Sequence, residues 1–314
     1  MKKAIGIDIG SANVRLAVSG LDTKIYFEPA VVAVSRDDGR KVMACGNDAH
    51  YLYSRIPGGV KLVHPFTGET APDPLYSEAL LKYVIGKCRL RGPDAYLSYS
   101  GKHTKEAEKI VVDAAQNGGA GSVISVDPSY AAACGCGYRG MGENIIANIG
   151  ASVCDIAAYS HSKMVELRTC GYAGRAVDKS IGTGIFHKYR FSITPDTAES
   201  IKLSFVSLTK PADTPFVIPV TKPTVGLPCR LTLTPAEVSG FAEKVTDELI
   251  DEIVEVLRNM PAEPDKIVLT GGGAKLNGFP AALESIVRLP VVVANEPENA
   301  VIRGIIHIID SDEG

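Results

Sequence analysis

The sequence lacks the features that mark several specialised classes of protein. Its seven cysteines are an odd number without CxxC spacing, so we expect neither a disulfide framework nor a zinc site, and a reducing compartment is favoured. No apolar run is long enough to cross a bilayer. The net charge of −3 provides no basic field that would attract nucleic acid. We therefore expect a cytoplasmic protein without a nucleic-acid partner, and peripheral contact with the inner face of the membrane stays open.

Common catalytic signatures are also missing. Neither GxxxxGK[ST] nor GxSxG occurs, which excludes a P-loop and the nucleophile turn of serine hydrolases. The six histidines form no spaced cluster, so we assign no metal site or catalytic triad to them. Any phosphate site must therefore be built on another kind of turn.

Length and composition indicate a two-domain α/β protein. The chain has 314 residues, more than most single domains contain. An apolar fraction of 45% and a charged fraction of 22% are enough for a core in each domain. Strand-like apolar runs alternate with segments of helical periodicity, a pattern typical of a layered α/β fold.

Three local predictions can be made from residue types. The motif Thr234-Pro-Ala-Glu237 has an N-cap Thr, Pro at N1 and Glu at N3, and it predicts a helix that runs to about Asn259. Ser77 is predicted to cap a helix that ends near Cys88. The Pro-, Thr- and Val-rich segment 206–233 predicts a β-hairpin outside the core.

One pattern occurs twice, once near the start of each half of the chain. Ile145–Tyr159 is typical of an apolar strand, a tight turn at Gly150, and a second apolar strand. Ile5–Val18 shows the same pattern with Gly10 at the turn, 140 residues earlier (residue 10 against residue 150). The repeat predicts a duplicated architecture, and a glycine turn of this kind exposes backbone N–H groups that suit phosphate oxygens.

The first copy carries an acid next to its turn. Asp8 lies two residues before Gly10, where a strand-end carboxylate can hold Mg²⁺ while the turn amides meet phosphate. The alternative is a solvent-facing hairpin whose Asp has no ligand. The second copy, at 148–152, favours a shared anion between the two turns.

A third glycine-rich segment follows an apolar strand near the C-terminus. Gly271, Gly272 and Gly273 let the backbone approach a ligand closely, although an ordinary strand-to-helix loop is the alternative. Glu199 and Lys202 share one helix face and could flank a purine, but their spacing alone favours a solvated pair.

Two further acids lie near the turns. Asp127 or Asp155 could orient an attacking water, and both fit turn or strand-end roles equally well.

The ordered series of motifs resembles the MreB family of bacterial actin-like, rod-shape-determining proteins, within the actin/heat-shock-chaperone/sugar-kinase superfamily. The resemblance covers nearly the whole chain. It is carried by GIDIGSANVRLAV (6–18), EPAVVAV (28–34), ACGNDA (44–49), RIPGGV (55–60), HPFTGE (64–69), LLKYVI (80–85), NIGASVCDIAAYS (148–160), GYAGRAVDKSI (171–181), TAESIK (197–202), GLPCRLTLTPAEV (226–238) and IVLTGGGAKLNGFPAAL (267–283).

This resemblance implies an actin-like ATPase fold with two related domains, each with a small outer subdomain, and a nucleotide cleft between them. Domain I would span 1–147 with its outer subdomain at about 31–64, and domain II would span 148–314 with its outer subdomain at about 183–234. ATP or ADP would bind with Mg²⁺, and Asp8 would serve the metal. The implied nucleotide-binding residues are Asp8, Gly10, Ser11, Ala12, Asn13, Asn148, Gly150, Ala151, Ser152, Gly174, Glu199, Lys202, Gly271, Gly272 and Gly273.

The chain departs from the family pattern at the positions for hydrolysis. Asn148 stands where the family has Asp, and Val153 stands where it has a hydroxyl-bearing residue. Asp127-Pro128 stands where the family has a Glu-Pro pair. The Asp side chain is shorter, and the pair is one residue out of register. Asp127 is therefore the residue that the resemblance implies as the catalytic candidate. Losing a positioned base typically costs about 10²–10⁴ in rate. We therefore expect hydrolysis to be weak or absent, and whether the protein is an enzyme stays open.

The resemblance leaves two main functional interpretations. In the first, the protein polymerises into filaments that organise cell shape or cell-wall synthesis, with itself and membrane-associated cell-wall or shape proteins as partners. In the second, it is a non-polymerising pseudo-ATPase that acts as an adaptor or nucleotide sensor. A sugar or acetate kinase is disfavoured because no acidic acceptor-site insertion is visible.

Overall fold

The computed structural model describes residues 3–20, 24–68, 70–100, 104–137, 142–161, 163–224 and 226–312. The chain divides into two units. The first contains Met1–Arg139 together with Glu298–Gly314, and the second contains Gly140–Pro297. The C-terminal segment thus packs with the first unit, whereas a division of the sequence after residue 147 assigns it to the second.

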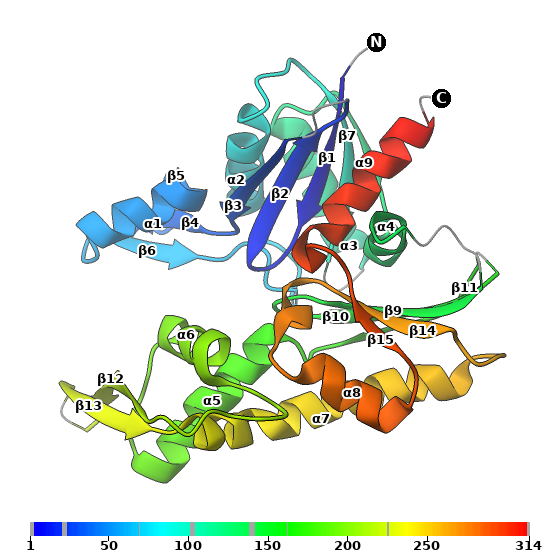
Figure 1. The fold of residues 1–314 in the computed structure, drawn as a ribbon. Helices are drawn as coiled ribbons and strands as arrows, with labels where there is room; N and C mark the ends of the chain where they lie inside the picture. The colour runs from blue at the N-terminus through cyan, green and yellow to red at the C-terminus, as the bar shows by residue number, and fades with distance from the viewer. Residues whose placement is uncertain are drawn as a thin grey trace. The chain divides into compact units, whose positions relative to one another are not determined.

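The first unit is built on a five-stranded sheet with the strand order β3-β2-β1-β7-β8 (Figure 1). Its strands are β1 (Ala4–Ile9), β2 (Asn13–Val18), β3 (Ile25–Pro29), β7 (Asp94–Tyr99) and β8 (Ser122–Ser125). A smaller sheet has the order β5-β4-β6, formed by β4 (Val32–Ser35), β5 (Val42–Cys45) and β6 (Val60–Val63). The helices of this unit are α1 (Gly46–Arg55), α2 (Pro74–Gly86), α3 (Lys105–Asn117), α4 (Pro128–Gly135) and α9 (Ala300–Asp312).

The two faces of β1 meet different helices. Ile5, Ile7 and Ile9 are fully buried in the apolar cluster to which α2 and α3 contribute. Gly6 lies on the opposite face, because successive strand residues alternate. A Cβ on Gly6 would come within 2.9 Å of Ile305 in α9, so the absence of a side chain lets α9 lie close against the sheet. Asp8 shares that face with Gly6.

The helices α4 and α9 lie against each other (Figure 1), and each carries a glycine at the contact. A Cβ on Gly135 would lie 1.8 Å from the carbonyl oxygen of Ala300, and one on Gly304 would lie 1.7 Å from that of Ala131. No side chain fits at either point. This close contact holds the C-terminal helix in the first unit.

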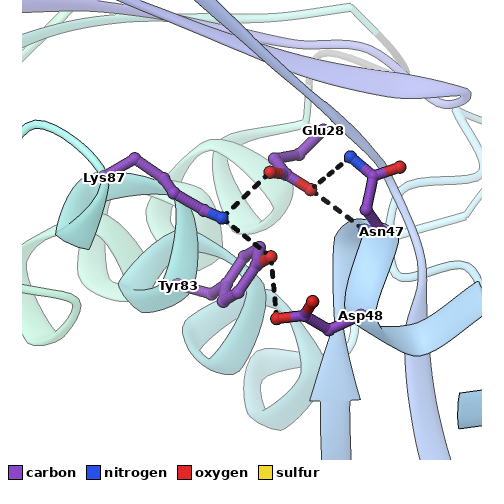
Figure 2. A network of polar contacts seen from close by, with 5 residues as sticks. All are labelled: Glu28, Asn47, Asp48, Tyr83 and Lys87. Atoms are coloured by element: carbon purple, nitrogen blue, oxygen red, sulfur yellow. Dashed lines mark hydrogen bonds and ion pairs between the residues drawn. The ribbon is translucent and has the colours of Figure 1, made fainter. Parts of the chain in front are cut away.

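A buried carboxylate joins the small sheet region of the first unit to the large one (Figure 2). Helix α1 follows Cys45, whose side chain provides no cap. Instead Glu28 of β3 accepts hydrogen bonds from the backbone N–H of Asn47 at 2.9 Å and from its side-chain amide at 3.1 Å. The other oxygen of Glu28 pairs at 3.2 Å with Lys87, the residue that directly follows α2. A carboxylate at a helix N-terminus is stabilised by the helix dipole, so Glu28 caps α1 from a distant strand.

The Lys87 ammonium extends this network along α2. It donates to the Tyr83 hydroxyl at 2.9 Å, and that hydroxyl donates to Asp48 of α1 at 3.1 Å (Figure 2). Two motifs that are separate in the sequence, EPAVVAV and ACGNDA, thus meet through one set of polar contacts.

The second unit repeats the plan of the first. Its five-stranded sheet has the order β11-β10-β9-β14-β15, which matches the first sheet strand for strand. The strands are β9 (Glu143–Ile149), β10 (Cys154–Ser160), β11 (Lys163–Cys170), β14 (Lys266–Thr270) and β15 (Val291–Val293), with a two-stranded sheet of β12 (Phe216–Lys222) and β13 (Leu227–Leu233). The helices are α5 (Gly174–Tyr189), α6 (Pro195–Phe205), α7 (Pro235–Asn259) and α8 (Phe279–Val287), with short 3₁₀ turns η1 (Gly272–Lys275) and η2 (Pro297–Asn299), the latter at the boundary of the two units.

Helix α7 begins as its motif predicts. The Thr234 side chain accepts a hydrogen bond from the Glu237 backbone N–H at 3.3 Å, and Pro235 is the first helical residue. The Glu237 carboxylate also accepts a hydrogen bond from the Thr234 backbone N–H, as a capping box requires. It is held by Lys188 and Tyr189 at the end of α5, which fastens the two helices together.

Two local predictions are wrong. Helix α2 starts at Pro74, where Asp73 accepts from the N–H of Leu75 at 2.9 Å, so Asp73 is the cap and Ser77 lies buried within the helix. The hairpin predicted within 206–233 is present as β12–β13, but the prediction that it lies outside the core is wrong. One face of the hairpin is buried against α5 and α7, since alternation turns Ile218, Val220, Leu231 and Leu233 inward.

Within the described residues, no helix has both the length and the apolar character needed to span a membrane.

Replacing Gly304 by Ala tests the α4–α9 contact. The new methyl group would overlap the Ala131 carbonyl, so we expect a loss of about 3 kcal/mol in unfolding free energy. Gly240→Ala is the matched control, because Gly240 is exposed in α7 and a Cβ there would meet no atom within 4 Å; it should gain about 0.5–1 kcal/mol. Urea denaturation followed by circular dichroism measures both changes. Equal midpoints for Gly304→Ala and the wild type would contradict this packing.

Candidate functional site

The two central hairpins turn in the same way. The N–H of Gly10 donates to the Asn13 carbonyl at 3.0 Å, and the N–H of Gly150 donates to the Val153 carbonyl at 2.9 Å. A Cβ on either glycine would lie within 3.0 Å of the same carbonyl that accepts its hydrogen bond. Glycine is therefore favoured at both turns for one steric reason, and the predicted repeat is confirmed at the level of individual atoms.

Asp8 stands in a row of residues that crosses the first sheet. In the strand register it lies opposite Arg15 of β2 and beside Ser98 of β7. Arg15 approaches the Asp8 carboxylate at 3.6 Å, donates to Asn299 at 3.2 Å, and lies 5.6 Å from the ring centroid of Phe27. Since Arg15 serves three partners, it neutralises Asp8 only in part.

The ionisation of Asp8 reflects this environment. Its side chain is 7% exposed, and burial raises the pKa of the carboxyl from 3.8 to about 6, against the opposing effect of Arg15. Above that pH the site holds a charge that burial disfavours. A cation beside Asp8 would relieve this cost, and Mg²⁺ is commonly held by one or two carboxylates together with nucleotide phosphates. The described residues contain no group of three or more His, Cys, Asp or Glu side chains that could hold a metal without phosphates.

The rest of the first turn follows Gly10. Ser11 is buried, Ala12 accepts a hydrogen bond from the N–H of Ala30 at 2.8 Å, and Asn13 begins β2. The turn is thereby fixed to the chain that enters β4.

The second sheet has the corresponding row with its charge moved by one strand. Asn148 of β9 lies opposite Asp155 of β10 and beside Thr270 of β14. The Thr270 hydroxyl donates to the Asn148 side-chain oxygen at 3.2 Å, and Thr169 donates to the Asp155 carboxylate at 2.6 Å. Asn148 and Asp155 are 7% and 2% exposed. The position equivalent to Asp8 is therefore a neutral amide, and the acid is on the neighbouring strand where the first sheet has Arg15.

Helix α5 begins against the second turn. The N–H of Gly174 donates to the Gly150 carbonyl at 3.2 Å, and the N–H of Arg175 donates to the Ala151 carbonyl at 2.7 Å. The Arg175 guanidinium also donates to the Ser152 hydroxyl at 3.1 Å. The turn and the start of α5 thus form one connected backbone structure.

Lys202 ties α6 to that structure. Its ammonium contacts the two Asp178 carboxylate oxygens at 2.9 and 3.0 Å and donates to the Gly174 carbonyl at 3.2 Å. Burial raises the pKa of the Asp178 carboxyl, and the Lys202 charge opposes that rise. Glu199, one turn earlier on α6, is exposed. Lys202 therefore helps to hold α6 against α5, whereas the Glu199 side chain is accessible to solvent.

The three consecutive glycines after β14 divide into two kinds. A Cβ on Gly271 would lie 2.3 Å from the Ile149 carbonyl, and one on Gly273 would lie 2.3 Å from the Ile149 side chain. Gly271 also has a φ of +78°, which favours glycine. A Cβ on Gly272 would meet nothing within 4 Å. Packing against β9 accounts for the outer two glycines, and only Gly272 leaves open space for a ligand.

The acid Asp127 caps helix α4. Its carboxylate accepts from the N–H of Tyr130 at 2.8 Å, and the residue is exposed. Its assignment as a water-orienting residue stays a prediction.

Several predicted residues meet within one unit. Gly174 contacts both Gly150 and Lys202, and Arg175 joins Ala151 and Ser152 to the same helix start. Other contacts connect Asn148 to the segment Thr270–Gly273. Sequence reasoning assigned no role to the partners Arg15, Arg175 and Asp178. The repeat could have indicated Arg15, because the offset of 140 residues makes it the counterpart of Asp155 in the second copy.

The whole architecture matches solved structures of actin-like proteins. MreB5 of Spiroplasma citri bound to ADP superposes with a TM-score of 0.88 at 25% identity, over 100% of this chain and 97% of that one. A MamK double helical filament gives a TM-score of 0.84 at 18% identity, over 99% of each chain. The protein therefore has the actin-like ATPase fold.

The family is shown by sequence comparison. The model of the MreB/Mbl protein family matches residues 2–313. The cell shape-determining protein Mbl of Bacillus subtilis is 30% identical over 96% of this chain and 93% of its own length. The cell shape-determining protein MreB of Escherichia coli is 27% identical over 96% of this chain and 91% of its own. This chain belongs to the MreB/Mbl family.

Replacing Asp8 by Asn separates a role in cation binding from a role in folding. Because the pKa in the folded state is raised to about 6, Asp8 favours folding below its ordinary pKa of 3.8, and that contribution is lost as the pH rises through about 6. In metal-free buffer, Asp8→Asn should match the wild type near about pH 4 and exceed it by up to about 3 kcal/mol near about pH 7.5. Its affinity for Mg²⁺–ATP should fall by about 10- to 100-fold.

Urea denaturation over this pH range and titration with a fluorescent ATP analogue measure the two effects. Asp37→Asn, at an exposed position of the same unit, is the control and should change neither. Unchanged nucleotide affinity together with lower stability at neutral pH would show that Asp8 serves the fold.

Replacing Gly272 by Ala tests the open space after β14. The methyl group meets no neighbour, so stability should stay within about 0.5 kcal/mol of the wild type. If the backbone approaches a ligand here, nucleotide affinity should fall at least about tenfold, since the added methyl occupies the ligand's space. Gly240→Ala serves as the control in the same unit, and full affinity in Gly272→Ala would assign all three glycines to packing.

Proposed function

We propose that this protein binds ATP or ADP with Mg²⁺, polymerises into filaments and organises cell shape or cell-wall synthesis, with weak hydrolysis. The single observation that carries nucleotide binding is the pair of identical glycine turns, one at the same place in each of two sheets of the same strand order. Turns that present backbone N–H groups beside a buried carboxylate suit a magnesium-bound polyphosphate.

The relatives support the choice of ligand. Solved structures of Spiroplasma citri MreB5 contain ADP or AMPPNP, at 25% and 24% identity to this chain. The residues proposed to receive the phosphates are the turn residues Gly10–Asn13 and Gly150–Ser152. Asp8 would hold Mg²⁺, which neutralises phosphate charge when bound. The glycines after β14, Gly272 above all, would lie beside the adenosine.

Self-association is supported by the same comparisons. MamK, which shares the fold over 99% of the chain, is solved as a double helical filament. Curated relatives are named cell shape-determining proteins. We propose self-assembly in the cytoplasm, at the inner face of the membrane, with membrane-associated shape or cell-wall proteins as partners.

Three side chains support the proposal of weak hydrolysis. Asn148 provides an amide whose oxygen already accepts from Thr270, so no carboxylate stands at that position. Val153 has no hydroxyl to place a water. Asp127 is engaged as the cap of α4 through one oxygen. These substitutions favour the second candidate as well, a non-polymerising pseudo-ATPase that acts as an adaptor or nucleotide sensor.

The experiment that separates the candidates combines assembly with turnover. The purified full-length chain is examined by sedimentation and negative-stain microscopy with ATP, with ADP and without nucleotide, while phosphate release is recorded. We expect filaments that require nucleotide, and phosphate release about 10² or more below that of a filament-forming relative. Nucleotide binding without any assembly would establish the second candidate. Turnover equal to that of the relative would contradict weak hydrolysis.

A further inference from the structure

Two of the seven free cysteines face each other across neighbouring strands. Cys154 is the first residue of β10 and Cys170 is the last of β11, and they are partners in the antiparallel register. Directly opposed residues in such a ladder have Cα atoms about 4.5–5.5 Å apart, inside the range of about 4.4–6.8 Å that a disulfide needs. In the strand registers of the described residues, no other pair joins two cysteines.

We propose that Cys154 and Cys170 form a redox modification site, in which a low-molecular-weight disulfide converts the two thiols reversibly into a cross-strand disulfide.

The two thiols differ in access. Cys154 is fully buried in the apolar cluster that contains Ile156 and Leu249, whereas Cys170 is half-buried at the margin of that cluster on the edge strand of the sheet. A reagent in solution therefore meets Cys170 first. Cys154 can be reached only through its neighbour.

The two thiols also differ in ionisation. A hydrogen bond between them lowers the pKa of Cys170 and, together with burial, raises the pKa of Cys154. The thiolate is the reacting form in disulfide exchange. Access and ionisation thus assign the same order, with Cys170 attacking first and Cys154 resolving the intermediate.

The exchange balances in two steps. The Cys170 thiolate attacks one sulfur of the reagent disulfide, forming a mixed disulfide and releasing one reagent thiol. The Cys154 thiol then loses its proton and attacks the Cys170 sulfur, which releases the second reagent thiol. In sum, two protein thiols are oxidised to one disulfide, and one reagent disulfide is reduced to two thiols.

The charges around the pair select the reagent. Glu252 of α7 acts on both thiols, and Glu248 acts on the neighbouring Tyr172, in each case as a negative charge that raises a pKa. Arg168, two residues before Cys170 on β11, is a cation whose charge is shared between Glu252 and Glu255. The surroundings are therefore acidic on balance, so a cationic disulfide approaches Cys170 more readily than an anionic one.

The position of the pair gives the bond a local consequence. Cys154 directly follows Val153 of the second turn, and Cys170 directly precedes the segment Gly171–Gly174 that leads into α5. Hydrogen bonds already join the turn to the start of α5. A disulfide would add a covalent link between the two strands that support this contact, and would limit how far they can separate.

The test uses the full-length chain, reduced and then freed of reductant. It is treated with cystamine, which is cationic, or with oxidised glutathione, which is anionic, and followed by intact mass and peptide mapping. We expect the loss of two hydrogens, a linked peptide that contains Cys154 and Cys170, full reversal by dithiothreitol, and a rate several-fold faster with cystamine.

Three variants assign the order of reaction. Cys154→Ser should accumulate a mixed disulfide at Cys170, and Cys170→Ser should leave Cys154 unmodified. Cys88→Ser is the matched control, since Cys88 is also half-buried but lies in the first unit with its thiol donating to the Ile85 carbonyl at 2.9 Å. It should leave the linked peptide unchanged.

The wild-type protein alone can overturn the proposal, whatever the folding of the variants. A stable mixed disulfide at Cys170 without linkage, or reaction at Cys88 and Cys229 while Cys170 stays reduced, would exclude the site. A faster reaction with oxidised glutathione would contradict the assigned charge selection.

Discussion

A single hydrogen bond, from a glycine N–H to a carbonyl three residues later, closes the central hairpin of each sheet. The bond at Gly10 and its copy at Gly150 set the register of the strands that leave each turn. Because side chains alternate along a strand, that register decides which residues share a face. The opposed pairs Asp8–Arg15 in one sheet and Asn148–Asp155 in the other are direct results of it.

The two rows use the same backbone for different electrostatics. In the first, a buried acid is compensated in part by Arg15, which leaves it suited to a cation. In the second, the acid is on the neighbouring strand and accepts from Thr169, while Asn148 accepts from Thr270. The two sheets therefore have the same strand order but carry their charged residues at different positions. This difference supports the proposal that Asp8 holds the metal, because the equivalent position in the second sheet carries no charge.

Sequence reasoning succeeded where structure is set by neighbours in the chain. The glycine turns and the start of α7 at Thr234 depend on residues a few positions apart, and both were predicted. It failed where the partner is distant. The cap of α1 is Glu28, nineteen residues before Asn47, and nothing near Cys45 indicates it. The role of Lys202 likewise required the position of Asp178 on another helix, so spacing along α6 alone suggested a solvated residue.

The membership of α9 in the first unit has a consequence for synthesis. The second unit is one continuous stretch, Gly140–Pro297, and all of it leaves the ribosome before α9 does. Until then the face of β1 that carries Gly6 lacks the helix that packs on it, and Gly135 lacks the partner it contacts. Since domains fold largely in the order in which they are made, the second unit can reach its native structure first. The part of the protein that begins the chain is thus the last to be completed.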